Sequence, residues 1–186
     1  MRITGGVYGG RTLAVPKSDA IRPTQDRVRQ ALFNIVQGEV PGCDFLDLFA
    51  GSGAVGLEAL SRGAAAATFV EQSRRHVAAL ERNVAAILGA RADAATVVAA
   101  DVYRWIAAYT GPGFSVGFAD PPYRLGEERG YAQVLATLAA RGVIRADGLC
   151  VAEMTAVQKA EETPGWELLR DRAYGRTRIC IWRRQS

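Results

Sequence analysis

Apolar residues follow two alternating patterns along the chain, short continuous runs and longer stretches with helical spacing. Runs of five or six residues begin at Phe45, Ala67 and Phe114, and each is typical of a buried strand. Between such runs, apolar residues lie three or four positions apart, as in 28–36 and 77–88, which is typical of a helix with one buried face. Alternating strands and helices predict a mostly parallel sheet with helices on both faces.

The predicted elements divide the chain into an N-terminal extension, residues 1–38, and an α/β domain, residues 39–186. Within the extension, a glycine-rich turn predicts a β-hairpin, and a helix follows Thr24, its expected N-cap. A closing antiparallel hairpin brings the sheet to seven strands. Strands are expected at 45–49, 67–71, 96–98, 114–119, 148–153, 166–173 and 176–182, with helices at 53–62, 73–88, 102–108 and 131–141.

Basic residues gather at the two ends of the chain. The net charge of +4 divides into +4 for residues 1–30, +5 for residues 170–186 and −5 for the segment between them. Arg accounts for 21 of the 23 basic residues, which either reflects a coding bias or predicts a phosphate-binding surface, because the guanidinium fork matches phosphate oxygens. We give these two interpretations equal weight at this point.

Composition excludes several classes of protein. Apolar residues make up 49% and charged residues 23%, which is typical of a globular domain, and no apolar run reaches the ~18 residues of a membrane span. Three cysteines, an odd number, favour buried thiols in a reducing cytoplasm over a disulfide framework. The single histidine, His76, excludes a multi-histidine metal site, and we expect no metal. Nothing in the sequence demands more than a monomer.

A glycine motif follows the first strand of the predicted sheet. Residues 51–56 read G-x-G-x-x-G between a strand and a helix, and Glu71 lies 20 residues after Gly51. Such glycines let the backbone approach a ligand closely, and an acid at the end of the second strand can accept hydrogen bonds from a ribose. The motif favours an adenosine-containing ligand over glycines that serve packing alone. By itself it does not choose between a nicotinamide cofactor and S-adenosylmethionine.

Further acids follow the strands at the same edge of the sheet. Asp47 is expected to orient the glycine loop and to meet a cationic amino-acid group, which favours S-adenosylmethionine over an anionic pyrophosphate. Asp101 is expected to contact an adenine amine, to cap the helix 102–108, or both, with Val102 against the ring. The expected cofactor-binding residues are Asp47, Phe49, Ala50, Gly51, Ser52, Gly53, Glu71, Gln72, Asp101, Val102 and Asp120.

The tetrapeptide Asp120-Pro121-Pro122-Tyr123 directly follows the fourth strand. Two successive prolines force a rigid extended turn, which fixes the Asp120 carboxylate and the Pro121 carbonyl as hydrogen-bond acceptors. Two converging acceptors suit an amino group on a planar ring, and Tyr123 offers a surface on which that ring can stack. We therefore expect Asp120, Pro121, Pro122 and Tyr123 to be the catalytic residues for methyl transfer to an exocyclic nitrogen.

Together these motifs resemble the class I S-adenosylmethionine-dependent methyltransferases that act on nucleobase amines. Segments 22–34 and 45–64, with Ile3-Thr4-Gly5-Gly6 and Gly10-Arg11, are similar to the bacterial 16S rRNA guanine-N2 methyltransferase family. The resemblance implies a Rossmann-like seven-stranded sheet, methylation of guanine 966, and 16S rRNA as partner, free or within an assembling small ribosomal subunit. The N-terminal extension would then bind RNA through Arg2, Arg11, Arg22, Thr24, Arg27 and Arg29.

Other functions remain open from the residues alone. The Asp-Pro-Pro-Tyr turn also serves DNA amino-methyltransferases and other nucleobase methyltransferases of this fold. A nucleic-acid-binding module without catalysis would not need that turn. A nucleotide-dependent oxidoreductase would use a similar glycine loop. Comparing the affinities for S-adenosylhomocysteine and NAD by calorimetry would distinguish it from a methyltransferase.

Overall fold

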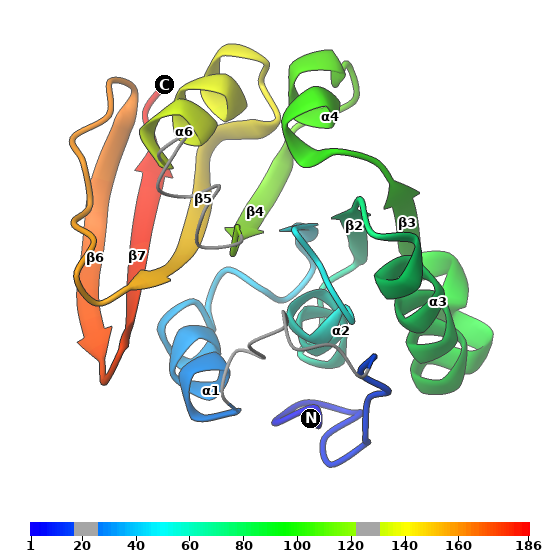
Figure 1. Ribbon diagram of the computed structural model, residues 1–186. Helices are drawn as coiled ribbons and strands as arrows, with labels where there is room; N and C mark the ends of the chain where they lie inside the picture. Colours follow the sequence, from blue (N-terminus) through cyan, green and yellow to red (C-terminus); the bar gives the residue numbers. More distant parts are fainter. Residues whose placement is uncertain (17–25, 122–130) are drawn as a thin grey trace.

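A computed structural model describes residues 1–16, 26–121 and 131–186 (Figure 1). In this part of the chain seven strands form one sheet in the order β3-β2-β1-β4-β5-β7-β6. The first five strands run parallel, and β7 is antiparallel to both of its neighbours. The strands are β1 (Asp44–Leu48), β2 (Ala66–Glu71), β3 (Ala95–Ala99), β4 (Phe114–Ala119), β5 (Ile144–Thr155), β6 (Trp166–Tyr174) and β7 (Thr177–Arg184).

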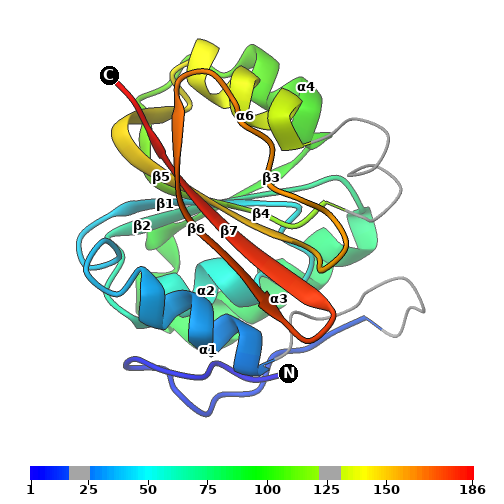
Figure 2. The same cartoon turned by 90° about the vertical axis from the view of Figure 1, so that its left-hand side faces the viewer.

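Helices cover both faces of the sheet, which confirms the predicted Rossmann-like α/β fold. Figure 2 shows α1, α2 and α3 on one face and α4 and α6 on the other. Alternate residues of each strand serve the two faces: Phe45 and Phe69 pack toward α1–α3, whereas Leu46 and Val70 pack toward α4 and α6. The helices are α1 (Asp26–Ile35), α2 (Ala54–Ser61), α3 (Arg74–Leu88), η1 (Gly89–Ala94), α4 (Val102–Ala108) and α6 (Tyr131–Ala140). Among the described residues, no helix is long and apolar enough to cross a membrane.

The strand order reverses direction between β1 and β4. From β1 the chain moves outward to β2 and β3, and then returns to the other side of β1 with β4. The loops that follow β1 and β4 therefore diverge, and this is where ligands bind in open parallel sheets. We refer to the edge at which the five parallel strands end as the carboxyl edge.

The N-terminal hairpin is held by few but regular backbone bonds. Arg2 and Thr12 form an isolated antiparallel bridge, and Ile3 N–H donates to the Arg11 carbonyl at 3.0 Å. Ile3 and Leu13 are buried in the same hydrophobic core as Phe45 and Phe69. The boundary predicted at residue 38 is therefore not a break in the core, because the extension packs directly onto the α/β domain.

Strand β5 starts at Ile144, four residues before the predicted start at Gly148. Residues 145–147 interrupt the apolar pattern before the predicted strand, and the pairing with β4 shifts register between Phe114 and Val116. A Cβ atom at Gly148 would lie 3.0 Å from the Ser115 carbonyl oxygen. The irregularity is therefore a bulge within a longer strand, and glycine permits the close approach to β4.

Candidate active site

The glycine loop between β1 and α2 adopts a conformation that requires glycine. Gly51 and Gly53 have φ values of 56° and 79°, in the left-handed region. At Gly53 a Cβ atom would also lie 2.2 Å from Cδ1 of Leu80, and at Gly56 it would lie 2.3 Å from Cε1 of Phe69. The missing Cβ atoms therefore let the loop approach α3 closely at Gly53 and let α2 approach β2 closely at Gly56. The loop is thereby fixed at the carboxyl edge.

Asp47 lies inside β1 and holds the start of α2. Its side chain is buried, and Oδ2 accepts a hydrogen bond from the Gly56 N–H at 2.8 Å. Burial raises the pKa of the Asp47 carboxyl to about 8; the Gly56 hydrogen bond opposes this rise, and the nearby Glu71 carboxylate adds to it. Asp47 therefore orients the glycine-loop region, which is the first of the two roles expected for it.

Glu71 ends β2 and joins two loops at the carboxyl edge. One carboxylate oxygen accepts from the Gly51 N–H at 2.9 Å, and the other accepts from the Ser73 N–H at 2.8 Å. The Nδ1 atom of His76 lies 3.6 Å from the second oxygen. The position 20 residues after Gly51 thus brings the predicted acid into direct contact with the glycine loop.

The residues predicted to surround an adenine lie after β2 and β3. Asp101 caps α4 as expected, because its Oδ1 accepts from the Arg104 N–H at 2.9 Å. Val102 is buried, and Gln72 is exposed next to Glu71. Sequence reasoning did not identify Tyr103, whose ring stands edge-on to that of Phe49 with centroids 5.7 Å apart. This aromatic pair joins the segment that follows β1 to α4, the helix that follows β3.

Asp120 and Pro121 follow β4 immediately. Because Leu48 and Ala119 are partners in the β1–β4 register, Asp120 lies beside the start of the glycine loop. Asp120 is partly buried and Pro121 is buried. Burial raises the pKa of the Tyr131 hydroxyl well above its usual value, and the Asp120 carboxylate contributes to this rise. Pro122 and Tyr123, the other predicted catalytic residues, lie outside the described residues.

Asn83 on α3 joins the N-terminal extension to the glycine loop. Its Nδ2 donates to the carbonyl oxygens of Ser52 and Ala14, both at 2.9 Å, and its Oδ1 accepts from the Ala14 N–H at 2.8 Å. The side chain is buried. Sequence reasoning missed this residue, because an Asn within a helical pattern carries no local sign of partners that are 31 and 69 positions away.

The structure corrects one predicted RNA-binding residue, Arg29. Its side chain is fully buried, and Nε donates to Oε2 of Glu58 on α2 at 2.6 Å. Its Nη2 donates to the Arg2 carbonyl and lies 3.0 Å from Oδ1 of Asp26. A guanidinium with these partners and no solvent exposure does not reach a phosphate, so Arg29 instead anchors α1 to α2.

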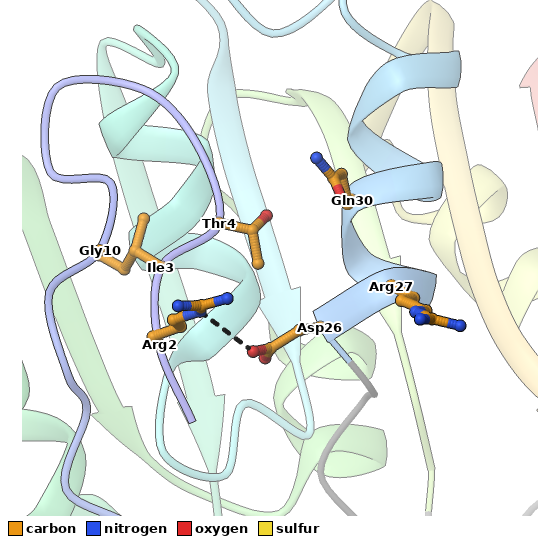
Figure 3. A pocket seen from close by; sticks show the side chains of 7 residues that line it. All are labelled: Arg2, Ile3, Thr4, Gly10, Asp26, Arg27 and Gln30. Carbon is orange, nitrogen blue, oxygen red and sulfur yellow. Dashed lines mark ion pairs between the residues drawn. The ribbon is translucent and has the colours of Figure 1, made fainter.

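The other predicted RNA-binding residues that the structure describes are exposed. Arg2 and Arg27 flank the start of α1, and Arg11 lies at the hairpin, where its Nη1 donates to the Ile87 carbonyl at 2.7 Å. Arg22 and Thr24 lie outside the described residues. A pocket of about 430 Å³ opens between the hairpin and the first turns of α1 (Figure 3), where Asp26 lies 3.6 Å from Nε of Arg2. Its lining residues are Arg2, Ile3, Thr4, Gly10, Asp26, Arg27 and Gln30.

Similarity to known proteins extends over nearly the whole chain. Residues 1–183 match the family described as Conserved hypothetical protein 95. The chain belongs to this family. Ribosomal RNA small subunit methyltransferase D of Escherichia coli (strain K12) is 35% identical over 187 residues, which cover 100% of this chain and 91% of that relative. The family resemblance predicted from the motifs is confirmed.

Solved structures agree with this family assignment. The structure of yhhF from Escherichia coli superposes with a TM-score of 0.85 at 35% identity. The superposition covers 100% of this chain and 98% of the yhhF chain. The structure of a hypothetical protein from Thermus thermophilus superposes with a TM-score of 0.78 at 36% identity. The superposition covers 97% of this chain and 98% of the Thermus chain. Both the fold and its N-terminal extension are therefore shared within the family.

Proposed function

We propose that the chain transfers a methyl group from S-adenosylmethionine to the exocyclic N2 of a guanine in 16S rRNA, at guanine 966. The observation that carries this proposal is the position of Asp120 and Pro121 next to the glycine loop, on adjacent strands at the carboxyl edge. A cofactor held by the loop would then meet an amino group held by the turn. The Escherichia coli relative, named as a ribosomal RNA methyltransferase, supports rRNA as the substrate.

The residues at the carboxyl edge fit S-adenosylmethionine. The left-handed glycines give the loop a backbone that a ligand can approach closely. Asp47 holds that region through the Gly56 N–H, and Glu71 is an acid beside the loop that suits a ribose. Phe49 and Tyr103 offer apolar rings near Asp101, where an adenine would lie. When bound, S-adenosylmethionine would supply a methyl group on a positively charged sulfur. The guanine N2 would attack the methyl carbon in line while the carbon–sulfur bond breaks, which leaves S-adenosylhomocysteine.

The turn after β4 holds the amino group in this proposal. The Asp120 carboxylate and the Pro121 carbonyl accept hydrogen bonds from the two N2 protons, and so direct the nitrogen lone pair toward the methyl group. As the bond forms, nitrogen becomes positive, and the Asp120 carboxylate stabilises that charge and accepts the departing proton, directly or through water. Positioning of this kind supplies roughly 7–11 kcal/mol of the barrier reduction. Tyr123 would hold the guanine ring by stacking.

The extension holds the RNA in this proposal. A base must leave its stack to enter a pocket at the carboxyl edge, which favours loops and single strands. Arg2, Arg11 and Arg27, together with Arg22 and Thr24, would contact the backbone around that base. The substrate is 16S rRNA, free or within an assembling small subunit, and the protein acts as a monomer in the cytoplasm.

Transfer of labelled methyl groups from S-adenosylmethionine tests the proposal directly. The substrates are 16S rRNA, partly assembled small subunits and DNA of matched length, and the modified nucleoside is identified after digestion. We expect N2-methylguanosine from rRNA, and at least a hundredfold slower transfer by Asp120→Ala with unchanged affinity for S-adenosylhomocysteine. Asp93→Ala, an exposed carboxylate on η1, is the matched control. Full activity of Asp120→Ala, or modification of DNA instead of rRNA, would contradict the proposal.

A further inference from the structure

The turn of the closing hairpin lies at the same edge of the sheet as the candidate active site. Strand β5 runs parallel to β4, so Thr155 at its end lies at the carboxyl edge. Thr155 pairs with Thr177 at the start of β7, and Thr177 pairs with Tyr174 at the end of β6. The turn around Gly175 is therefore at the carboxyl edge, although the hairpin lies far from the glycine loop in sequence.

Two arginines of β6 lie on the face of the sheet that carries α1. Residues directly opposite each other in an antiparallel pair share a face. Arg170 pairs with Ile181 and Arg172 pairs with Ile179, and both isoleucines belong to the core beneath α1, α2 and α3. Figures 1 and 2 show the hairpin turn beside α1, which lies between the turn and the N-terminal segment in Figure 1.

The charges of these arginines are not neutralised locally. Arg170, Arg172 and Arg176 are all exposed, and within the described ranges none of them forms an ion pair with a carboxylate. The Nη1 atom of Arg170 donates to the Leu169 carbonyl at 2.8 Å. The nearby Asp171 lies on the opposite face, where its Oδ1 accepts from Nη1 of Arg178 at 2.5 Å.

The remaining carboxylate of β6 lies at the other end of the strand. Glu167 is the backbone register partner of Arg183, and Nη2 of Arg183 lies 3.4 Å from Oε1 of Glu39. The acidic groups of the hairpin are therefore either turned to the other face or placed near the amino edge, which is the edge at which the five parallel strands begin. Within β6 and the turn that follows it, the charged groups that remain beside the carboxyl edge on this face are three arginines, Arg170, Arg172 and Arg176, which we call the hairpin patch.

We propose that the hairpin patch binds phosphates of the same RNA whose base enters the candidate active site. This inference rests on the proposed function and gives the RNA a second contact surface besides the N-terminal extension. Three strand spacings of about 4.8 Å separate β4 from β6, so the patch lies roughly 14 Å from the turn that holds the base. That span is short enough for one RNA strand to place a base at the turn and phosphates of neighbouring nucleotides at the patch. Arginine suits this contact because its fork binds phosphate with two hydrogen bonds.

Charged side chains on an edge strand also protect it from pairing with another sheet, and reversing the sign of the charges keeps this protection. Exposed charges of either sign prevent an edge strand such as β6 from pairing with another sheet. Replacing the three arginines by glutamate keeps three charges on the edge but repels phosphate. A loss of RNA binding in this variant therefore reports on phosphate contacts rather than on protection of the edge.

The experiment compares two triple variants with equal net charge. Arg170→Glu, Arg172→Glu and Arg176→Glu are combined in one, and the control combines three exposed arginines near the amino edge, Arg91→Glu, Arg141→Glu and Arg145→Glu. Anisotropy of a labelled 16S rRNA fragment is measured from about 50 to about 200 mM salt. We expect at least tenfold weaker RNA binding by the hairpin variant, a salt slope smaller by about two, and a change within threefold for the control.

Two further measurements distinguish a misfolded variant from a failure of the hairpin patch and from a failure of the proposed function. Thermal unfolding and binding of S-adenosylhomocysteine report whether each variant folds, and Arg176→Glu alone, in the turn, replaces the triple variant if it does not. Equal RNA binding by the hairpin and control variants would overturn the hairpin patch while methyl transfer by the wild type stands. Absence of methyl transfer by the wild type, with the expected loss of RNA binding in the hairpin variant, would overturn the proposed function and leave the patch.

Discussion

The Nε atom of Arg29 lies 2.6 Å from Oε2 of Glu58, and neither side chain is exposed to solvent. Glu58 also accepts from the Thr4 N–H at 3.1 Å and from Nη2 of Arg62 at 2.8 Å. Three segments that are distant in sequence, residues 2–4, α1 and α2, thus share one buried network of charges. The network holds the N-terminal extension to the helix that begins at the glycine loop.

Removing the central carboxylate of this network should destabilise the protein strongly. Glu58→Ala leaves the Arg29 guanidinium buried without its main partner, and breaking a buried ion pair on one side costs about 3–5 kcal/mol. The free energy of unfolding, from urea titration, measures the effect. Glu81→Ala, an exposed carboxylate on α3, should change it by less than about 0.5 kcal/mol. If Glu58→Ala lowered the free energy of unfolding by less than about 1 kcal/mol, the network would contribute little to the stability of the folded protein.

Replacing Asn83 should lower cofactor affinity as well as the stability of the folded protein. Asn83→Ala removes the donor that fixes the Ser52 carbonyl, so the glycine loop is no longer held in one position for its ligand. We expect at least tenfold weaker binding of S-adenosylhomocysteine by calorimetry and a stability loss of about 1–3 kcal/mol. Arg82→Ala, on the exposed side of the same helix, is the control. Unchanged affinity would mean that the loop holds its shape without Asn83.

Local patterns predicted the elements of this protein better than they predicted its long-range pairs. Helix 102–108 and strand 114–119 have the predicted bounds, because an acidic cap starts the first and a continuous apolar run forms the second. The sequence predicted Arg29 as an RNA-binding residue, because the sequence alone does not reveal that Glu58 lies opposite it in the fold. A charge can be buried wherever a partner is supplied from elsewhere in the chain, and such partners have no local signature.

The candidate site shows the same division. Asp47, Glu71 and Asp101 follow from their positions in or after strands, because parallel strands end at a common edge. Asn83 and Tyr103 lie inside helical patterns in which nothing distinguishes them from other residues. The position of the hairpin patch depends on strand order and register, since only the pairing of β5, β7 and β6 places residues 170–176 at the carboxyl edge.

Alanine at Gly53 should lower the free energy of unfolding more than alanine at Gly51, although both positions lie in the glycine loop. At Gly51 a Cβ atom meets no atom within 4 Å, so Gly51→Ala carries only the cost of a left-handed φ, about 1–2 kcal/mol. At Gly53 the same φ strain adds to a contact of 2.2 Å with Leu80, which forces the loop or α3 to move. Urea titration should therefore show a larger loss for Gly53→Ala. Equal losses in the free energy of unfolding would mean that the Leu80 side chain can move away from the new Cβ atom without destabilising the fold.

The buried carboxyl of Asp47 makes stability depend on pH in a predictable direction. Its pKa is about 8 in the folded protein because of burial, whereas an Asp in the unfolded chain titrates near a pKa of about 4. Between these values the folded state holds a proton that the unfolded state has lost. The free energy of unfolding should therefore decrease as pH rises from about 4 to about 8 and change little from this source above that range.

Asp47→Asn tests this directly, because the amide oxygen can still accept from the Gly56 N–H but the side chain does not titrate. Urea titrations at several pH values between about 5 and about 8 should give a flatter pH dependence for Asp47→Asn than for the wild type. The other titrating groups are common to both proteins and cancel in the difference. Asp93→Asn, which is exposed, should follow the wild-type curve. Parallel curves for wild type and Asp47→Asn would show that Asp47 is ionised in the folded protein throughout this range.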